Sequence, residues 1–265
     1  MAIYYRAKAH RDLGQNQASR DGMRHVADRA GRLAPDAARG LAHLARAAGD
    51  FPTALATART LGWPGRGHRV LGDIHFAHGD MDQAATHYTT ARTQAEEQGN
   101  LGEQAIAQAN LALTTAFTDP SRADGEIALA EQLLTGLDQR ATTLTAQIAA
   151  IARDAGTLTN LEGAPVLRTE IHTAGITAAR AALDLALAFH HAARDDDAAL
   201  TTTIDHLNSP TGPGDYAYYA DIARFMAGRP LPQPTITRWL DDEDAVRNRW
   251  RTLVTARHGH LRTGR

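Results

Sequence analysis

Hydrophobic residues recur every three or four positions along most of the chain, which is the period of amphipathic α-helices. This pattern predicts helices over 2–13, 16–32, 35–48, 51–61, 66–78, 81–98, 101–117, 121–136, 138–154, 168–193, 196–207, 215–227 and 242–258. Alanine, the best helix former, supplies much of the apolar content, whereas a sheet core needs more valine, isoleucine and phenylalanine. We therefore expect an all-α protein with no sheet.

The helical pattern is interrupted most clearly at 156–166. Shorter interruptions at 208–214 and 228–232 contain glycine and proline, which is typical of loops. We place a domain boundary in the first interruption. It divides the chain into a helical repeat array over 1–156 and a C-terminal helical region over 157–265, which holds one further hairpin and a terminal helix.

Two segments of the chain, 41–54 and 71–84, align with each other. The matched positions are Leu41 with Leu71, Ala42 with Gly72, Gly49-Asp50 with Gly79-Asp80, and Ala54 with Ala84. A leucine followed by a small residue lets the first helix pack closely on its partner. Glycine then ends that helix in a left-handed conformation, and aspartate caps the next helix. The alanine one turn later lies where the two helices are expected to cross.

The repeated pattern resembles the tetratricopeptide (TPR) consensus, whose units are about 34 residues long. The best match covers 65–98, with Leu71, Gly72, Gly79, Asp80, Ala84, Tyr88 and Ala91 at the expected positions. A further unit starts near Leu185 and continues through an aspartate-rich turn at 195–197 that has no glycine. The resemblance implies an α-solenoid of antiparallel helical hairpins, wound as a right-handed superhelix, with a less regular C-terminal part.

Charge and composition narrow the functional classes. The chain of 265 residues has a formal net charge of −2 and a single lysine, Lys8, so it has no overall attraction to nucleic acid or anionic membranes. The absence of cysteine excludes disulfides and thiolate metal sites, and no apolar run is long enough to span a bilayer. The chain also lacks a signal-peptide pattern and the common phosphate, nucleophile, zinc-protease and dinucleotide motifs. We expect a cytoplasmic protein that is not an enzyme, holds no cofactor or metal, and contacts neither nucleic acid nor membrane.

Two histidines invite a metal interpretation. His75 and His78 lie one helical turn apart, and Asp80 follows. His75, however, occupies a core position of the repeat, and no third ligand is spaced to join the pair. A structural role is the preferred interpretation.

Two further clusters allow a functional as well as a structural interpretation. The densest aromatic group comprises Tyr216, Tyr218, Tyr219 and Phe225. Most of it is expected in the core, with Tyr218 as a candidate exposed anchor. The predicted helix 242–258 starts with acidic residues and continues with arginines, which suits the helix dipole; contact with nucleic acid is the alternative.

In TPR arrays the first helix of each hairpin lines the groove. The family's groove positions fall on Asp36, Arg39, His43 and Arg46, on Arg66, Arg69, Asp73 and Phe76, and on Ile106, Asn110, Leu113 and Phe117. From these we select as ligand-binding candidates Arg39, His43, Arg46, Arg66, Arg69, Asp73, Phe76 and Asn110. An arginine-rich groove that turns apolar suits a peptide with acidic groups and an apolar residue. The alternative is that these arginines only pair with Asp36 and Asp73 on neighbouring helices.

The resemblance implies a protein- or peptide-binding domain, the scaffolding or sensory part of a bacterial regulatory protein, because similar arrays occur in actinobacterial regulators. A quorum-type receptor for a short signalling peptide is the alternative, and an enzyme with a helical fold is the weaker one. The expected partner is a protein or peptide, with an acidic group as one feature. A folded partner needs the whole surface of the array, whereas a short peptide needs only the groove, so the shape of the site discriminates between them.

Overall fold

The structure is a computed structural model that describes residues 1–13, 15–64, 66–157, 163–208, 216–232, 239 and 242–263. Every regular element in these ranges is an α-helix, and none of the described residues forms a strand. The prediction of an all-α protein is therefore confirmed. None of the described helices is both long and apolar enough to cross a bilayer.

The helices follow the predicted order, and most begin and end within a few residues of the predicted positions. They are α1 (Ala2–Asp12), α2 (Asn16–Ala27), α3 (Ala34–Ala47), α4 (Phe51–Ala58), α5 (Gly67–Ala77), α6 (Met81–Glu97), α7 (Leu101–Thr118), α8 (Pro120–Leu134), α9 (Arg140–Arg153), α10 (Gly163–Ala174), α11 (Thr177–Ala193), α12 (Asp197–Asn208), α13 (Tyr218–Met226) and α14 (Glu243–Thr263).

One predicted helix was wrong. The pattern predicts a continuous helix over 168–193, but the structure has two helices, α10 and α11, which are separated at Gly175. The φ of Gly175 is 66°, a left-handed value that glycine adopts easily and that ends a helix. The predicted interruption at 156–166 was also too long, because α10 already begins at Gly163, and 158–162 and 209–214 lie outside the described residues.

The predicted Gly-Asp turns are present at both repeat positions. Gly49 and Gly79 have φ values of 77° and 70°, so each ends its helix in the left-handed conformation. The side chain of Asp50 then accepts a hydrogen bond from the backbone N–H of Thr53 at 3.2 Å. Asp80 caps α6 in the same way by accepting from Gln83 at 3.3 Å. The turn chemistry read from the sequence therefore determines where α4 and α6 start.

Small residues allow the two helices of a hairpin to approach closely. A Cβ atom added to Gly72 of α5 would lie 2.6 Å from the ring of Tyr88 on α6, so no larger residue fits there. Ala84, at the predicted crossing point, is fully buried. The repeat positions that the sequence singled out are thus the positions where the helices touch.

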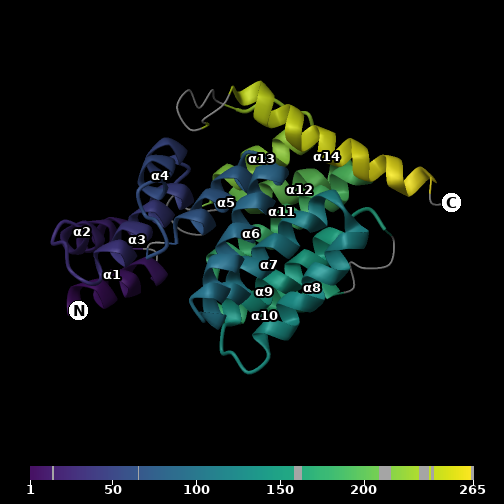
Figure 1. The fold of residues 1–265 in the computed structure, drawn as a ribbon. Coiled ribbons are helices and arrows are strands. Elements are labelled where there is room, and N and C mark those ends of the chain that lie inside the picture. Colours follow the sequence, from purple (N-terminus) through teal and green to yellow (C-terminus); the bar gives the residue numbers. More distant parts are fainter. Residues whose placement is uncertain are drawn as a thin grey trace.

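Each helix packs on the next one along the chain, from α1 to α14. Odd-numbered helices also contact one another, most extensively α7, α9 and α11. Figure 1 shows α1–α4 projecting from one side of a body formed by α5–α12, with α14 lying along its edge. Packing between neighbours is what a helical solenoid requires. The right-handed superhelix itself stays a prediction.

Three hydrophobic clusters hold the described helices together, and the smallest consists of Ala109, Ala130 and Ala146. A small one, made of Tyr4, Ala7, Met23, Ala37 and Leu44, joins α1, α2 and α3. The main cluster extends from Ala42 to Trp250. It takes residues from both sides of the predicted boundary at 156–166, so the two predicted regions share core contacts, and their division into two domains stays a prediction.

The C-terminal helices return to the N-terminal part of the chain. Trp250 of α14 is fully buried, and its indole N–H donates to the carbonyl of Ala77 at the end of α5 (3.2 Å). The backbone N–H of Tyr216, just before α13, donates to the carbonyl of Ala47 at the end of α3 (2.7 Å). These contacts join the C-terminal helices to the ends of α3 and α5.

Candidate ligand-binding site

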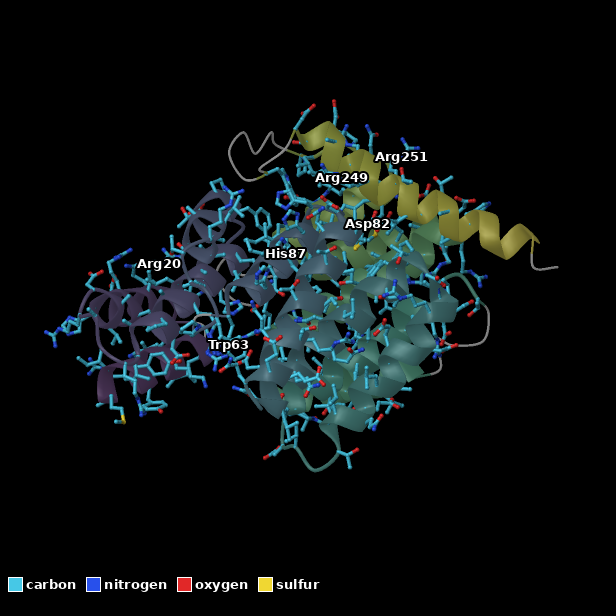
Figure 2. All side chains as sticks on the ribbon, in the orientation of Figure 1. Arg20, Trp63, Asp82, His87, Arg249 and Arg251 are labelled. Carbon is cyan, nitrogen blue, oxygen red and sulfur yellow. The ribbon has the colours of Figure 1, made fainter. Side chains whose placement is uncertain are left out.

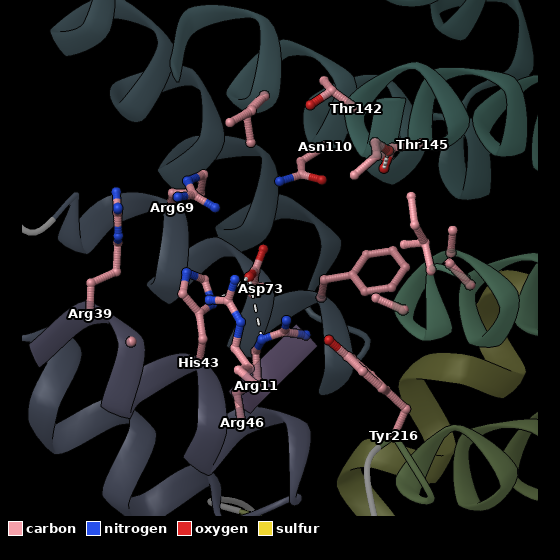
Figure 3. Close-up of a pocket in the computed structure, with 18 of the residues that line it drawn as sticks. Arg11, Arg39, His43, Arg46, Arg69, Asp73, Asn110, Thr142, Thr145 and Tyr216 are labelled. Atoms are coloured by element: carbon pink, nitrogen blue, oxygen red, sulfur yellow. Dashed lines mark hydrogen bonds and ion pairs between the residues drawn. The ribbon is translucent and has the colours of Figure 1, made fainter. Parts of the chain in front are cut away.

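A cavity of about 530 Å³ lies among the odd-numbered helices α1, α3, α5, α7, α9 and α11 and the start of α13. Figure 3 shows the side chains that converge on it. The volume lies within the range of pockets that take small ligands, roughly 300–1,000 Å³. The even-numbered helices contribute only Met23 and Tyr88, so the cavity is lined by the first helix of successive hairpins.

Most of the predicted site residues meet in this cavity. Its lining includes Arg39, His43, Arg46, Arg69, Asp73, Phe76 and Asn110. Arg66 lies beside the cavity and contacts Glu103, which does line it, at 2.8 Å. The structure therefore brings the eight candidates together in one region.

The register of the third unit was wrong by one turn. The prediction used positions 106, 110, 113 and 117, but Phe117 is buried in the core against Phe76 and Phe189. Instead, Glu103, Ile106, Asn110 and Leu113 line the cavity. Their spacing of three, four and three residues repeats that of positions 36, 39, 43 and 46. This shared spacing is the signal that could have identified Glu103.

Three arginines converge on Glu103, and we call Arg39, Arg66 and Arg69 the arginine cluster. Arg39 Nη1 and Arg66 Nε approach Glu103 Oε1 at 3.3 and 2.8 Å, and Arg69 Nε donates to Oε2 at 3.2 Å. Asp36 Oδ1 accepts from Arg39 Nη2 at 3.1 Å and from Arg66 Nη1 at 3.0 Å. The predicted pairing with Asp36 is thus present for Arg39 and Arg66, whereas Glu103 contacts all three arginines.

Burial of this charge cluster disfavours the charged form of Arg39. Burial lowers the pKa of Arg39 below its ordinary value, and the charges of Arg69 and Arg66 lower it further. Glu103 and Asp36 act in the opposite direction. Because the arginines repel one another, an additional anion at this position would be attracted to them.

A second polar group surrounds Asp73. Arg46 Nε lies 3.3 Å from Asp73 Oδ2, and the hydroxyl of Tyr88 donates to Asp73 Oδ1 at 2.7 Å. Arg46 also donates to the hydroxyl of Tyr218 at 3.3 Å and lies over the Tyr216 ring. Asp73 and Arg46 thus link α5 and α3 to the start of α13.

His43 is close to Asp73 but does not form an ion pair at neutral pH. Burial, together with the charges of Arg69, Arg46 and Arg39, lowers the pKa of His43 well below 6.5. Its Nδ1 lies 3.8 Å from Asp73 Oδ2, which is too long for a hydrogen bond. His43 therefore faces the cavity as a neutral ring.

The opposite part of the lining is weakly polar or apolar. It comprises Ile106 and Leu113 of α7, Thr142 and Thr145 of α9, and Ile176, Ala179 and Ala182 at and within α11. In Figure 3, Thr142, Thr145 and Asn110 lie apart from the labelled arginine side chains. A ligand in this cavity would meet charge at one end and a mostly uncharged surface at the other. The α9 and α11 residues were missed because the repeat pattern fades beyond α8.

The other residues singled out in the sequence have structural roles. Tyr218, the candidate exposed anchor, is buried (1% exposed) against Phe51, which corrects that prediction; Tyr216 and Tyr219 line the cavity instead. His78 is buried with its Nδ1 2.7 Å from the Ile74 carbonyl, whereas His75, predicted in the core, is half-buried. Among the described residues, no group of three or more candidate ligands could hold a metal ion.

The arginines of α14 are largely engaged within the protein. Arg247 pairs with Glu243 and Asp244 in the first turn of the helix. Arg249 donates to the carbonyl of His78 at 3.2 Å, and Figure 2 shows it on α14 with the exposed Arg251. The acidic residues Glu243 and Asp244 lie in the first turn of α14, where they suit the helix dipole.

Comparison of the chain with protein-family models, curated proteins and solved structures gives no match.

Proposed function

We propose that this protein is a TPR-like binding protein, rather than an enzyme, whose cavity takes a short peptide with an acidic group next to an apolar residue. One observation carries the proposal: an excess of basic side chains lines a cavity in a protein that is slightly acidic overall. The basic side chains of the lining are Lys8, Arg11, Arg39, Arg46 and Arg69, and the acidic ones are Asp36, Asp73 and Glu103.

The charge distribution supports an anionic ligand. The formal net charge of the chain is −2, so the positive lining is a local property and not a consequence of a basic protein. His43 is neutral and does not alter the balance. Arginine guanidinium groups bind carboxylates through paired hydrogen bonds, and they do so most strongly when water is partly excluded.

The size and lining of the cavity support a short ligand over a folded partner. The contact between Tyr216 and Ala47 joins the start of α13 to the end of α3, and Tyr216 and Tyr219 form part of the wall. A cavity of about 530 Å³ can hold a short peptide segment but not a folded domain. We therefore favour a receptor for a short signalling peptide, in a bacterial regulatory protein, over a scaffold for folded partners.

A screen of a short-peptide library tests the proposal. Selected peptides should carry an acidic residue beside an apolar one, and the corresponding amide should bind at least tenfold more weakly, or about 1.4 kcal/mol. Combining Arg66→Ala with Arg69→Ala should weaken binding at least tenfold, and the loss should shrink at high salt. Arg24→Ala is the matched control, because Arg24 forms an exposed pair with Asp21 on α2. Equal binding by the double variant would place the ligand site elsewhere.

A further inference from the structure

Three guanidinium groups of the arginine cluster surround the single carboxylate of Glu103. Glu103 Oε1 is approached by Arg39 and Arg66, and Oε2 by Arg69. The donors come from α3, from α5 and from the N-cap of α5, whereas Glu103 lies in the first turn of α7. Three separate positions of the chain thus meet at one oxyanion.

Arg66, one member of the arginine cluster, has a strained backbone conformation. Arg66 is the N-cap of α5 and has a φ of 53°, in the left-handed region that few residues other than glycine adopt. Its guanidinium nevertheless reaches both Asp36 (3.0 Å) and Glu103 (2.8 Å). Such strain persists where the surrounding contacts compensate for it, and it concentrates at ligand-binding positions.

The start of α7 does not depend on the Glu103 side chain. The side chain of Asn100 caps the helix by accepting a hydrogen bond from the Glu103 backbone N–H at 3.1 Å. A change of rotamer at Glu103 therefore leaves the cap in place. The Glu103 carboxylate can leave the arginine cluster without unwinding the helix that carries it.

Charge indicates what would replace it. Without Glu103, the arginine cluster and Asp36 together carry two net positive charges. A phosphate monoester carries about −1.5 to −2 at neutral pH and has three strong acceptor oxygens, one for each guanidinium. A ligand carboxylate has one negative charge and two oxygens, so it would only reproduce what Glu103 already supplies.

We propose that Glu103 is an internal stand-in for the ligand's anionic group, and that the arginine cluster takes a phosphate monoester in its place. This inference rests on the proposed peptide-binding function and narrows the ligand to a short phosphorylated peptide. Glu103 then competes with the ligand, so a peptide that carries a phosphate monoester should bind more tightly than one that carries only a carboxylate. The phosphate binds at the charged end of the cavity, and the rest of the peptide occupies the weakly polar end.

Calorimetric titration of the full chain near neutral pH tests the proposal with three probes: acetyl-Ala-phosphoserine-Ala-amide, acetyl-Ala-Glu-Ala-amide and inorganic phosphate. The phosphopeptide should bind at least tenfold more tightly than the glutamate peptide. Glu103→Gln should raise phosphopeptide affinity at least fivefold, because the competing charge is lost. Glu126→Gln is the matched control, since Glu126 pairs with Arg122 and Arg92 outside the cavity, and it should change nothing.

A second variant removes a donor without disturbing the backbone. Arg66→Asn should retain the melting temperature, because asparagine tolerates the left-handed conformation, and should weaken phosphopeptide binding at least tenfold. If Glu103→Gln does not fold, the arginine Nε–H signals of the unmodified protein provide the test. Those of Arg66 and Arg69 should shift as phosphopeptide is added, and unshifted signals would overturn the proposal.

The outcomes separate this inference from the proposed function. Equal binding of the two peptides overturns the phosphate site and leaves the peptide function standing. Binding of inorganic phosphate with no binding of either peptide supports the phosphate site and overturns the peptide function. An unchanged affinity in Glu103→Gln shows that Glu103 is not a competitor.

Discussion

In the cavity, the arginine cluster shares the side-chain carboxylates of Glu103 and Asp36. In α14, Arg257 has a different set of partners. Its Nη1 donates to the carbonyls of Ala152, Arg153 and Ala155 at 3.1, 2.8 and 3.3 Å, and its Nη2 donates to the carbonyl of Ala116 at 2.6 Å. Arg257 is 3% exposed, and burial lowers the pKa of its guanidinium to about 10.

The difference between the two sites lies in whether the partners can leave. The carbonyls of Ala116, Ala152 and Arg153 belong to the last turns of α7 and α9, where carbonyls have no N–H partner within their own helix, and Ala155 lies just beyond α9. Those acceptors are fixed, and Arg257 holds two helix ends against α14. Glu103 and Asp36 are side chains that can rotate away. The first arrangement suits stability, and the second suits exchange with a ligand.

The largest effect is expected at the buried arginine. Arg257→Met retains volume but leaves the helix-end carbonyls without their donor, so it should lower the free energy of unfolding by about 3 kcal/mol. Urea denaturation followed by circular dichroism measures this change. Arg251→Met, at an exposed site on the same helix, is the control and should have little effect. If Arg257→Met leaves the free energy of unfolding unchanged, Arg257 does not stabilise the fold and the contrast between the two arginine sites fails.

A purely steric change should affect stability without touching either arginine site. Ala84 is fully buried where α5 and α6 cross, so Ala84→Leu should overpack the hairpin and cost about 1–3 kcal/mol. The melting temperature should fall while peptide binding per folded molecule remains unchanged. An unchanged melting temperature would mean that this position can accommodate a larger side chain.

The region beside Arg257 should also respond to acid. Nδ1 of His190 accepts a hydrogen bond from the backbone N–H of Gly156 at 3.1 Å. Burial, with smaller contributions from His191 and Arg194, lowers the pKa of His190 from 6.5 to about 4. Between these values the unfolded chain binds the proton and the folded protein does not, so stability should fall as the pH decreases from 6.5 towards 4.

His190→Asn isolates this contribution, because the Asn oxygen can accept the same hydrogen bond and does not titrate. Over this pH range, the native protein should lose about 1–2 kcal/mol more than the variant. Identical pH profiles of unfolding would show that the histidine does not control this contact.

The smallest change in stability is expected in the arginine cluster. Arg69→Met should lower the free energy of unfolding by less than about 1 kcal/mol, because Glu103 keeps Arg39 and Arg66 as partners. Urea denaturation beside Arg257→Met gives the direct comparison. If Arg69→Met costs as much as Arg257→Met, the cavity arginines are structural and the comparison fails.

Local patterns predicted the elements because each depends on neighbouring residues. The Gly-Asp turns at 49–50 and 79–80 determine where helices end and begin, through backbone conformation and side-chain capping. The inward positions of the first two units came from the resemblance to TPR arrays. The break at Gly175 was missed because the apolar period continues on both sides of it, and a single glycine is also tolerated within helices.

The sequence by itself determined an all-helical chain and the turns of its repeats, because helical periodicity, turn glycines and capping aspartates act between neighbouring residues. Only the tertiary structure decided that Glu103 meets Arg39 and that Arg257 reaches Ala152, contacts that span 64 and 105 positions of the chain. Such long-range contacts depend on how each hairpin is oriented relative to the next, summed over many hairpins. No local period encodes that sum, so the site and its internal carboxylate emerge only when the whole chain is packed.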